Sequence, residues 1–257
     1  MGCHEAYNML YLSPIKGIDV WLASLTCASC WSGFVSWKEV LSKEECERAR
    51  RFVFDSDRRR FVRGHFLLRS ILGNYLQQDP RTIKYCCSKG EKPTLGHDVL
   101  KFNMSHSGEY ALYVVAKERE VGVDIEQIRP IDDFLQLAER FFTASESRTL
   151  RSFPLGRQLE AFLHCWCRKE ALLKATGKGL ALALDSVEVS IYGEGRLRQI
   201  SVECAPGLVT CWQVMSLPPV PGFVSALAVE GKLAKPSTGV SANLQPSPSW
   251  QPAEWLF

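Results

Sequence analysis

The stretch that decides the fold of this chain is Gly122-Val123-Asp124-Ile125-Glu126, in which apolar and acidic side chains alternate. Successive side chains of a β-strand point to opposite faces, so Val123 and Ile125 are predicted to share one face of the strand. Asp124 and Glu126 then project together from the other face, with Cα atoms roughly 7 Å apart, and could share a hard cation such as Mg²⁺. A strand that simply exposes two acids to solvent is the alternative.

A long helix is predicted downstream of this strand, from about residue 157 to residue 175, and Gly177 suits its C-terminal end. Glu170 and Lys174 lie four residues apart on one face of this helix, in the order that favours an ion pair. Glu170 is therefore a third candidate acid, and Lys174 and Lys169 are candidate phosphate contacts. An ordinary surface ion pair is the alternative.

The elements predicted around these two segments occur in an order that repeats. Strands are predicted at residues 18–25, 110–116, 121–126, 187–191, 196–200, 210–215 and 223–229, and further helices at 41–52, 58–77, 133–140 and 145–151. The order strand, helices, strands occurs in residues 1–118 and again in 119–231, so we expect an α+β fold of two similar α/β halves. Residues 232–257, rich in Pro and Ser, are predicted to form a poorly ordered tail.

Positive charge is concentrated between Lys43 and Arg69. This segment holds nine basic and five acidic residues and carries +4, whereas the whole chain carries only +3. Eight of the nine are arginines, whose planar guanidinium group suits phosphate. A small polyphosphate, a nucleic acid and a solvated helix face are all compatible with the cluster, and the missing aromatic interleaving disfavours nucleic acid.

Residues 102–108 are predicted to be a strand end that runs into a polar loop. They offer two serine hydroxyls and an imidazole within a short stretch, so Ser105 and His106 are candidate ligand-binding residues. The chain has no Gly-x-Ser-x-Gly elbow, no Gly-x4-Gly-Lys-Ser/Thr loop and no Gly-x-Gly-x-x-Gly turn. These absences disfavour a serine hydrolase and the common ATP and dinucleotide sites.

The composition is that of a globular protein. Of 257 residues, 46% are hydrophobic and 23% are charged, and no apolar run approaches the roughly 20 residues that span a bilayer. The 10 cysteines form no evident disulfide framework, and Cys27-x-x-Cys30 has metal-like spacing but no second pair of ligands. We therefore expect reduced cysteines and a cytoplasmic protein without a membrane segment.

Taken together, these motifs resemble a known family. Two segments are similar to the paired signature of the Sfp-type 4'-phosphopantetheinyl transferases. The first is the stretch 122–126, and the second, some forty residues later, is Trp166-Cys-Arg-Lys-Glu-Ala-Leu-Leu-Lys-Ala-Thr-Gly177. The second segment places the resemblance in the branch that carries Trp-x-x-Lys-Glu-Ala. Further motifs match in the same order: the arginine-rich helix 58–69, Lys92-Pro93, residues 102–108 and residues 141–146.

The resemblance implies a fold of two halves related by pseudo-twofold symmetry, with coenzyme A bound in a cleft between them. It implies an enzyme of the holo-[acyl-carrier-protein] synthase type, which moves the 4'-phosphopantetheine arm of coenzyme A onto a serine of an apo acyl or peptidyl carrier protein. The by-product is adenosine 3',5'-bisphosphate. The expected partners are coenzyme A and a carrier protein of fatty acid, polyketide or nonribosomal peptide biosynthesis, with no nucleic acid or membrane and with the chain acting as a monomer.

The resemblance also implies catalytic and metal-binding roles. Asp124, Glu126 and Glu170 would hold Mg²⁺, with Mn²⁺ as an alternative, against the pyrophosphate of the coenzyme. Glu170 is the first candidate for the base that accepts the serine proton, Glu146 is the second, and Lys174 is expected to assist at the phosphates.

The remaining carried-over residues are expected to bind coenzyme A. They are Arg48, Arg60, Lys92, Ser105, His106, Lys169 and Lys174, with Arg60 meeting the 3'-phosphate and Arg48 helping it. The family often has Lys where this chain has Glu45, which leaves the contribution of the first helix open.

Overall fold

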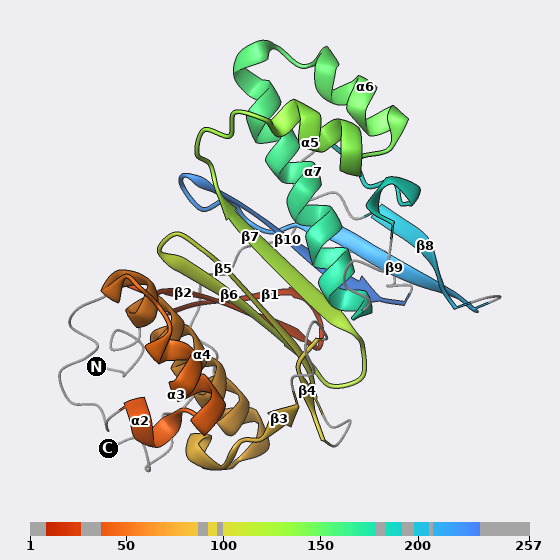
Figure 1. Ribbon diagram of the computed structural model, residues 1–257. Helices are drawn as coiled ribbons and strands as arrows, with labels where there is room; N and C mark the ends of the chain where they lie inside the picture. Colours follow the sequence, from red (N-terminus) through yellow and green to blue (C-terminus); the bar gives the residue numbers. More distant parts are fainter. Residues whose placement is uncertain are drawn as a thin grey trace.

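The computed structural model describes residues 9–26, 37–86, 92–96, 100–177, 183–191, 198–205 and 208–231. They form an α+β fold with two four-stranded antiparallel sheets (Figure 1), which confirms the expected fold class. Each sheet carries helices on one face and packs its other face against the second sheet, so the layers follow the order helix, sheet, sheet, helix.

The first sheet has the strand order β1-β2-β6-β5. Its strands are β1 (Met9–Ile15), β2 (Ile18–Ser24), β5 (Lys101–Ser107) and β6 (Tyr110–Ala116). One face is covered by α2 (Trp37–Val40), α3 (Lys43–Arg50) and α4 (Asp55–Leu76), followed by the short helix η2 (Pro80–Thr82) and the two-stranded sheet of β3 (Tyr85–Cys86) and β4 (Thr94–Leu95). Apolar residues recur along α4 at helical spacing, so Phe61, Leu68 and Leu72 are buried against this sheet.

The second sheet has the strand order β7-β10-β9-β8. Its strands are β7 (Val121–Gln127), β8 (Arg198–Ala205), β9 (Leu208–Ser216) and β10 (Phe223–Glu230). The helices of this half are α5 (Phe134–Phe141), α6 (Ala144–Ser152), α7 (Leu155–Thr176) and the short η4 (Leu184–Ser186), and Figure 1 shows α7 running along β7. Among the described helices, none is both long and apolar enough to cross a bilayer.

An apolar layer between the two sheets joins the halves. β7 packs against β5 and β6, and its Val123 and Ile125 are fully buried there together with Val20, Val114 and Leu227. The prediction that Val123 and Ile125 share one face of the strand is therefore confirmed, and that face is buried.

On its opposite face β7 approaches the backbone of α7 very closely, because Gly122 has no side chain. A Cβ atom at this position would lie 2.2 Å from the carbonyl oxygen of Ala171 and 2.4 Å from the amide nitrogen of Ala175. This close approach sets α7 directly over the face of β7 that carries the acids.

Most of the expected elements are present near their expected bounds. The helix α3 starts with a complete capping box between Ser42 and Glu45, and α7 ends at Gly177 with a left-handed φ of 69°. The strand β1 was not anticipated. Cys27 and Cys30, whose spacing is metal-like, and the predicted tail 232–257 lie outside the described residues.

Two of the local predictions are wrong. Residues 103–107 are not a loop but part of β5, which pairs with β6 along its whole length. The described residues 187–191 form no strand, because their backbone groups bond to helix side chains: the Val189 N–H donates to Glu146, and the Val187 carbonyl accepts from Lys169.

Candidate active site

The two acids of β7 lie beside two serines of β5. The Ser105 hydroxyl donates to Asp124 Oδ1 over 2.8 Å, and the Ser107 hydroxyl donates to Glu126 Oε2 over 2.9 Å. These bonds join the facing edges of the two halves, because β5 belongs to the first sheet and β7 to the second. Ser107 was not among the predicted site residues, although its spacing from Ser105 repeats that of the two acids.

Lys174 of α7 completes this group. Its ammonium lies 2.6 Å from Asp124 Oδ1 and 2.9 Å from the Ser105 hydroxyl. Lys174 thus pairs with an acid of β7, and its contacts bring residues from β5, β7 and α7 together.

Glu170 and Glu126 stand close enough to Asp124 to feel its charge. Burial, followed by the negative charge of Asp124, raises the pKa of Glu170 above its usual value, and Lys174 counteracts this only in part. The pKa of Glu126 is raised by the same two causes, against the hydrogen bond from Ser107. Three carboxylates therefore share one lysine.

This donor set has the chemistry that a hard divalent cation requires. Asp124 is only 2% exposed, and its Oδ2 is buried without a hydrogen-bond partner. A cation beside that oxygen would also offset the negative charge of Asp124, which after burial is the second cause of the raised pKa of Glu126 and Glu170. The side chains do not have the geometry of a bound metal ion, because within the described ranges no three His, Cys, Asp or Glu residues lie close enough together to coordinate one.

A group of positive charges adjoins the acids on the other side of β5. His106 follows Ser105 in the strand, so its side chain points to the face that carries α4. His106 is exposed at the surface, but partial desolvation lowers its pKa, and the charges of Lys174, His65, Arg48 and Arg60 lower it further. The charges of residues in α3, α4 and α7 thus all act on this histidine.

The nine basic residues between Lys43 and Arg69 have different roles. Arg60 makes a 3.2 Å ion pair with Asp57, but its Nε is buried and has no hydrogen-bond partner. Arg48 lies over the ring of Phe61, with its guanidinium carbon 5.1 Å from the ring centroid. By contrast, Arg63 and Arg69 are buried in the core of the first half.

Lys92 connects the two halves. Its ammonium lies 2.7 Å from Glu120 Oε2 and 2.8 Å from the Val121 carbonyl, and it also reaches the Ala175 carbonyl at the end of α7. Burial lowers the pKa of Lys92, and Glu120 counteracts this. The ammonium is thus already bonded within the protein.

Glu146 and Lys169 lie in the core of the second half. They are 2% and 1% exposed and form an ion pair of 2.8 Å. Lys169 also donates to the carbonyls of Leu184 and Val187, while Glu146 accepts from the N–H groups of Thr143 and Val189. This geometry does not bring either residue to the acids of β7.

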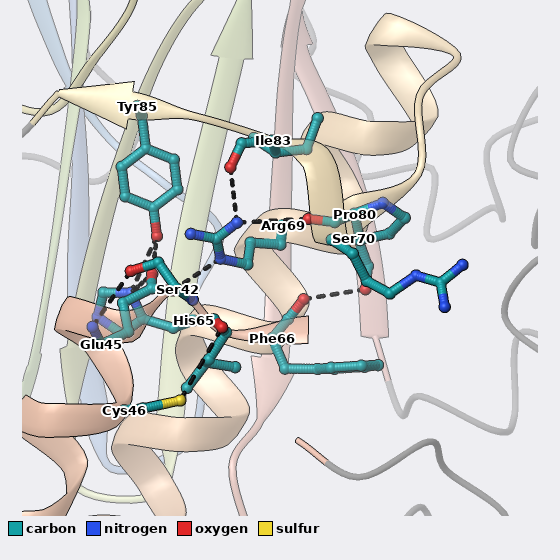
Figure 2. A network of polar contacts seen from close by, with 12 residues as sticks. Ser42, Glu45, Cys46, His65, Phe66, Arg69, Ser70, Pro80, Ile83 and Tyr85 are labelled. Carbon is teal, nitrogen blue, oxygen red and sulfur yellow. Dashed lines mark hydrogen bonds and ion pairs between the residues drawn. The ribbon is translucent and has the colours of Figure 1, made fainter. Parts of the chain in front are cut away.

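A second polar cluster, which the sequence did not reveal, surrounds Glu45 in the first half. Figure 2 shows its carboxylate approached by Ser42, His65, Arg69 and Tyr85. One sequence signal for it was the departure from Lys at this position.

Two family models match the chain. The model of the 4'-phosphopantetheinyl transferase superfamily covers residues 120–222, and a model of a 4'-phosphopantetheinyl transferase N-terminal region covers residues 29–119. The two matches adjoin at the turn between β6 and β7.

Several proteins are similar to this chain over more than half of its length. The 4'-phosphopantetheinyl transferase HetI of Nostoc sp. (strain PCC 7120) is 40% identical over 222 residues, covering 85% of this chain and 84% of the relative. The 4'-phosphopantetheinyl transferase Sfp of Bacillus subtilis (strain 168) is 33% identical over 173 residues, covering 67% and 75%. The human L-aminoadipate-semialdehyde dehydrogenase-phosphopantetheinyl transferase is 31% identical over 163 residues, covering 59% and 53%.

Proposed function

Because the chain belongs to the 4'-phosphopantetheinyl transferase superfamily, we propose that the acids of β7 and α7, the lysine beside them and the neighbouring cations form its active site. The chain is a transferase that moves the 4'-phosphopantetheine arm of coenzyme A onto a serine of an apo carrier protein. The products are a holo carrier protein and adenosine 3',5'-bisphosphate. The observation that carries the site assignment is the meeting of Asp124, Glu126 and Glu170 with Lys174 beside the cations around His106.

We assign Asp124, Glu126 and Glu170 to Mg²⁺, with Mn²⁺ as the alternative. The partnerless buried Oδ2 of Asp124 supports this assignment. When bound, the ion supplies charge neutralisation at the pyrophosphate. Lys174, whose ammonium is bonded to Asp124, would donate to a phosphate oxygen of the coenzyme.

The phosphates of coenzyme A are assigned to the surrounding donors. Ser105 and His106, both in β5, suit the pyrophosphate. Ser105 bonds to Lys174 of α7, and His106 feels the charge of the same lysine. Arg60, with its unpartnered Nε, suits the 3'-phosphate, and Arg48 suits the same group from α3. Lys92 and Lys169 were also expected to contact the coenzyme, but their bonds favour structural roles: Lys92 joins the halves and Lys169 neutralises a buried acid.

The reaction requires a proton acceptor for the serine. Its hydroxyl oxygen bonds to the phosphorus next to pantetheine as the bond from that phosphorus to adenosine 3',5'-bisphosphate breaks, and its proton passes to a base. Glu170 is favoured, because it lies close enough to Asp124 and Lys174 to feel their charges and so stands among the residues assigned to the reacting phosphates. Glu146 is disfavoured because both of its carboxylate oxygens are occupied in the core.

We further propose a monomeric enzyme of the cytoplasm that serves carrier proteins of fatty acid, polyketide or nonribosomal peptide synthesis. One chain contributes both sides of the site, namely residues 1–118 and 119–231. The described cysteines at 46, 165, 167 and 211 are free thiols, which fits a reducing compartment.

The test is intact-mass spectrometry of an apo acyl carrier protein and a peptidyl carrier domain incubated with coenzyme A, Mg²⁺ and the enzyme. We expect a mass gain of one phosphopantetheine arm, lost with EDTA and restored by excess Mg²⁺. Glu170→Gln should abolish the gain, whereas Glu160→Gln, on an exposed part of the same helix, should keep it. Normal turnover by Glu170→Gln would remove this residue from the roles of base and ligand.

A further inference from the structure

The cluster around Glu45 contains more bonds than a helix cap requires. A capping box uses the Glu45 carboxylate only for the N–H of Ser42, which lies 2.7 Å away. The same carboxylate also lies 2.7 Å from Arg69 Nε and 2.8 Å from His65 Nδ1, and it accepts a bond from the Tyr85 hydroxyl. Glu45 is buried, at 7% exposure, so these bonds form away from bulk water.

The additional donors come from separate elements of the first half. His65 and Arg69 belong to α4, Tyr85 belongs to β3, and Glu45 itself belongs to α3. Arg69 continues the network to the Ile83 carbonyl at 2.7 Å, as Figure 2 shows. One carboxylate therefore fixes how α3 sits on α4.

A chain of ring contacts leads from this carboxylate to Arg48. The ring of His65, whose Nδ1 donates to Glu45, lies 4.3 Å from the ring of Phe61 between centroids. The guanidinium of Arg48 lies over the same Phe61 ring. Arg48 follows Glu45 by three residues in α3, so both project toward α4 from the same side of the helix.

The charge of Arg48 is also felt in the active site, because it contributes to the lowered pKa of His106. A guanidinium on a long, flexible side chain loses considerable rotamer freedom when it binds phosphate. A protein that holds it over a ring beforehand removes part of that cost.

We propose that Glu45 is a positioning residue for coenzyme binding: through His65 and Phe61 it holds Arg48 ready for the 3'-phosphate. This inference rests on the proposed function, since Arg48 must meet that phosphate. A carboxylate at this position would repel the phosphate if it faced the ligand, so its burial behind two rings and an arginine is essential to the role.

The test compares the affinities of the full-length enzyme for coenzyme A and for dephospho-coenzyme A, which lacks the 3'-phosphate, by isothermal titration calorimetry without carrier protein. Glu45→Gln should weaken coenzyme A binding about tenfold, as for loss of one charge-assisted hydrogen bond. Binding of dephospho-coenzyme A should change less than about twofold, because that ligand makes no use of Arg48. Glu47→Gln, an exposed change on the same helix, is the matched control.

A second variant keeps the test decisive if Glu45→Gln does not fold. Phe61→Leu leaves the Glu45 cluster in place but removes the ring beneath Arg48, and it should produce the same difference between the two ligands. In an Arg48→Ala background, neither change should weaken coenzyme A binding further.

The inference would be overturned if the variants lost the same affinity for both ligands, or lost no affinity for coenzyme A. It would also be overturned if their loss of affinity added to that of Arg48→Ala. If the wild-type enzyme transferred no phosphopantetheine to any carrier protein, that result would count against the proposed function instead. The comparison of the two affinities does not depend on turnover, so the two failures can be told apart.

Discussion

At the scale of single residues, the Glu45 carboxylate links stability to pH. Its burial opposes ionisation, but hydrogen bonds from His65, Tyr85 and the Ser42 backbone and the charge of His65 lower its pKa from 4.5 to about 2. A carboxylate whose pKa is lower in the folded state stabilises the protein fully above pH 4.5, and this contribution is lost as the pH falls toward 2.

We therefore expect the difference in free energy of unfolding between wild type and Glu45→Gln to shrink by about 2 kcal/mol between pH 6 and pH 3. Urea unfolding at several pH values measures this difference. Glu47→Gln, at an exposed position of the same helix, is the control variant. A Glu45→Gln difference that grows on acidification would contradict the assigned ionisation.

The buried pair of Glu146 and Lys169 gives a prediction in which stability and activity separate. Glu146→Gln leaves the Lys169 ammonium without its counter-ion in the core and should destabilise the fold by about 3–5 kcal/mol. Because neither residue contacts the acids of β7, transfer per folded molecule should stay within about threefold at a temperature well below the melting point.

Thermal unfolding and the mass assay at low temperature measure the two effects. Glu139→Gln removes an exposed ion pair with Arg151 and should change stability by less than about 1 kcal/mol. An inactive Glu146→Gln enzyme with an unchanged melting temperature would restore Glu146 as a candidate base.

These residues also show where prediction from sequence stops. Strand alternation was enough to place Asp124 and Glu126 on one face, because a strand has only two faces. Lys169 and Glu170 are neighbours in the sequence, yet they point to different sides of α7, one into the core and one toward β7. A motif names both residues but does not say which one faces the ligand.

At the scale of elements, the contact between β7 and α7 depends on Gly122. In Gly122→Ala the new Cβ would collide with backbone atoms of Ala171 and Ala175, which cannot rotate away as a side chain can. We expect a loss of about 1–3 kcal/mol in stability, as for overpacking. Transfer should fall as well, because a shifted α7 carries Glu170 and Lys174 away from Asp124.

Melting temperature and kcat/KM measured together test this prediction. Gly156→Ala, in the helix α7 that packs on β7, is the matched control: its Cβ would meet nothing within 4 Å, and alanine favours helix, so it should be neutral or slightly stabilising. Full activity and stability of Gly122→Ala would mean that β7 and α7 do not require this close approach.

Elements with strong periodicity, such as α4 and α7, were predictable because their apolar positions leave one consistent face for the core. Residues 187–191 have the same alternation as a strand, with Val187, Val189 and Ile191 buried. Their partners are side chains from α6 and α7 instead of another strand. Alternation reports burial of every second residue, but it does not identify the hydrogen-bond partner.

At the scale of the whole molecule, the site depends on how the two halves meet. Serines from the first half bond acids of the second, and Lys92 binds both β7 and the end of α7. None of these contacts is local in sequence, so the repeated order of elements predicted two halves but not the bonds between them. The resemblance supplied the expectation of a shared site, and the geometry identifies the atoms that join the halves.

The apolar layer between the sheets predicts that the halves unfold together. Val20 and Val114 of the first sheet and Val123 and Leu227 of the second are fully buried against one another, so separating the halves would expose this whole layer to water. We expect one calorimetric transition with equal calorimetric and van't Hoff enthalpies. In native-state hydrogen exchange, the most protected amides of β2 and β9 should open with the same free energy, which is that of global unfolding. Two separated transitions, or a free energy of opening for β2 well below that for β9, would show that the halves are independent and that the site assembles only when they dock.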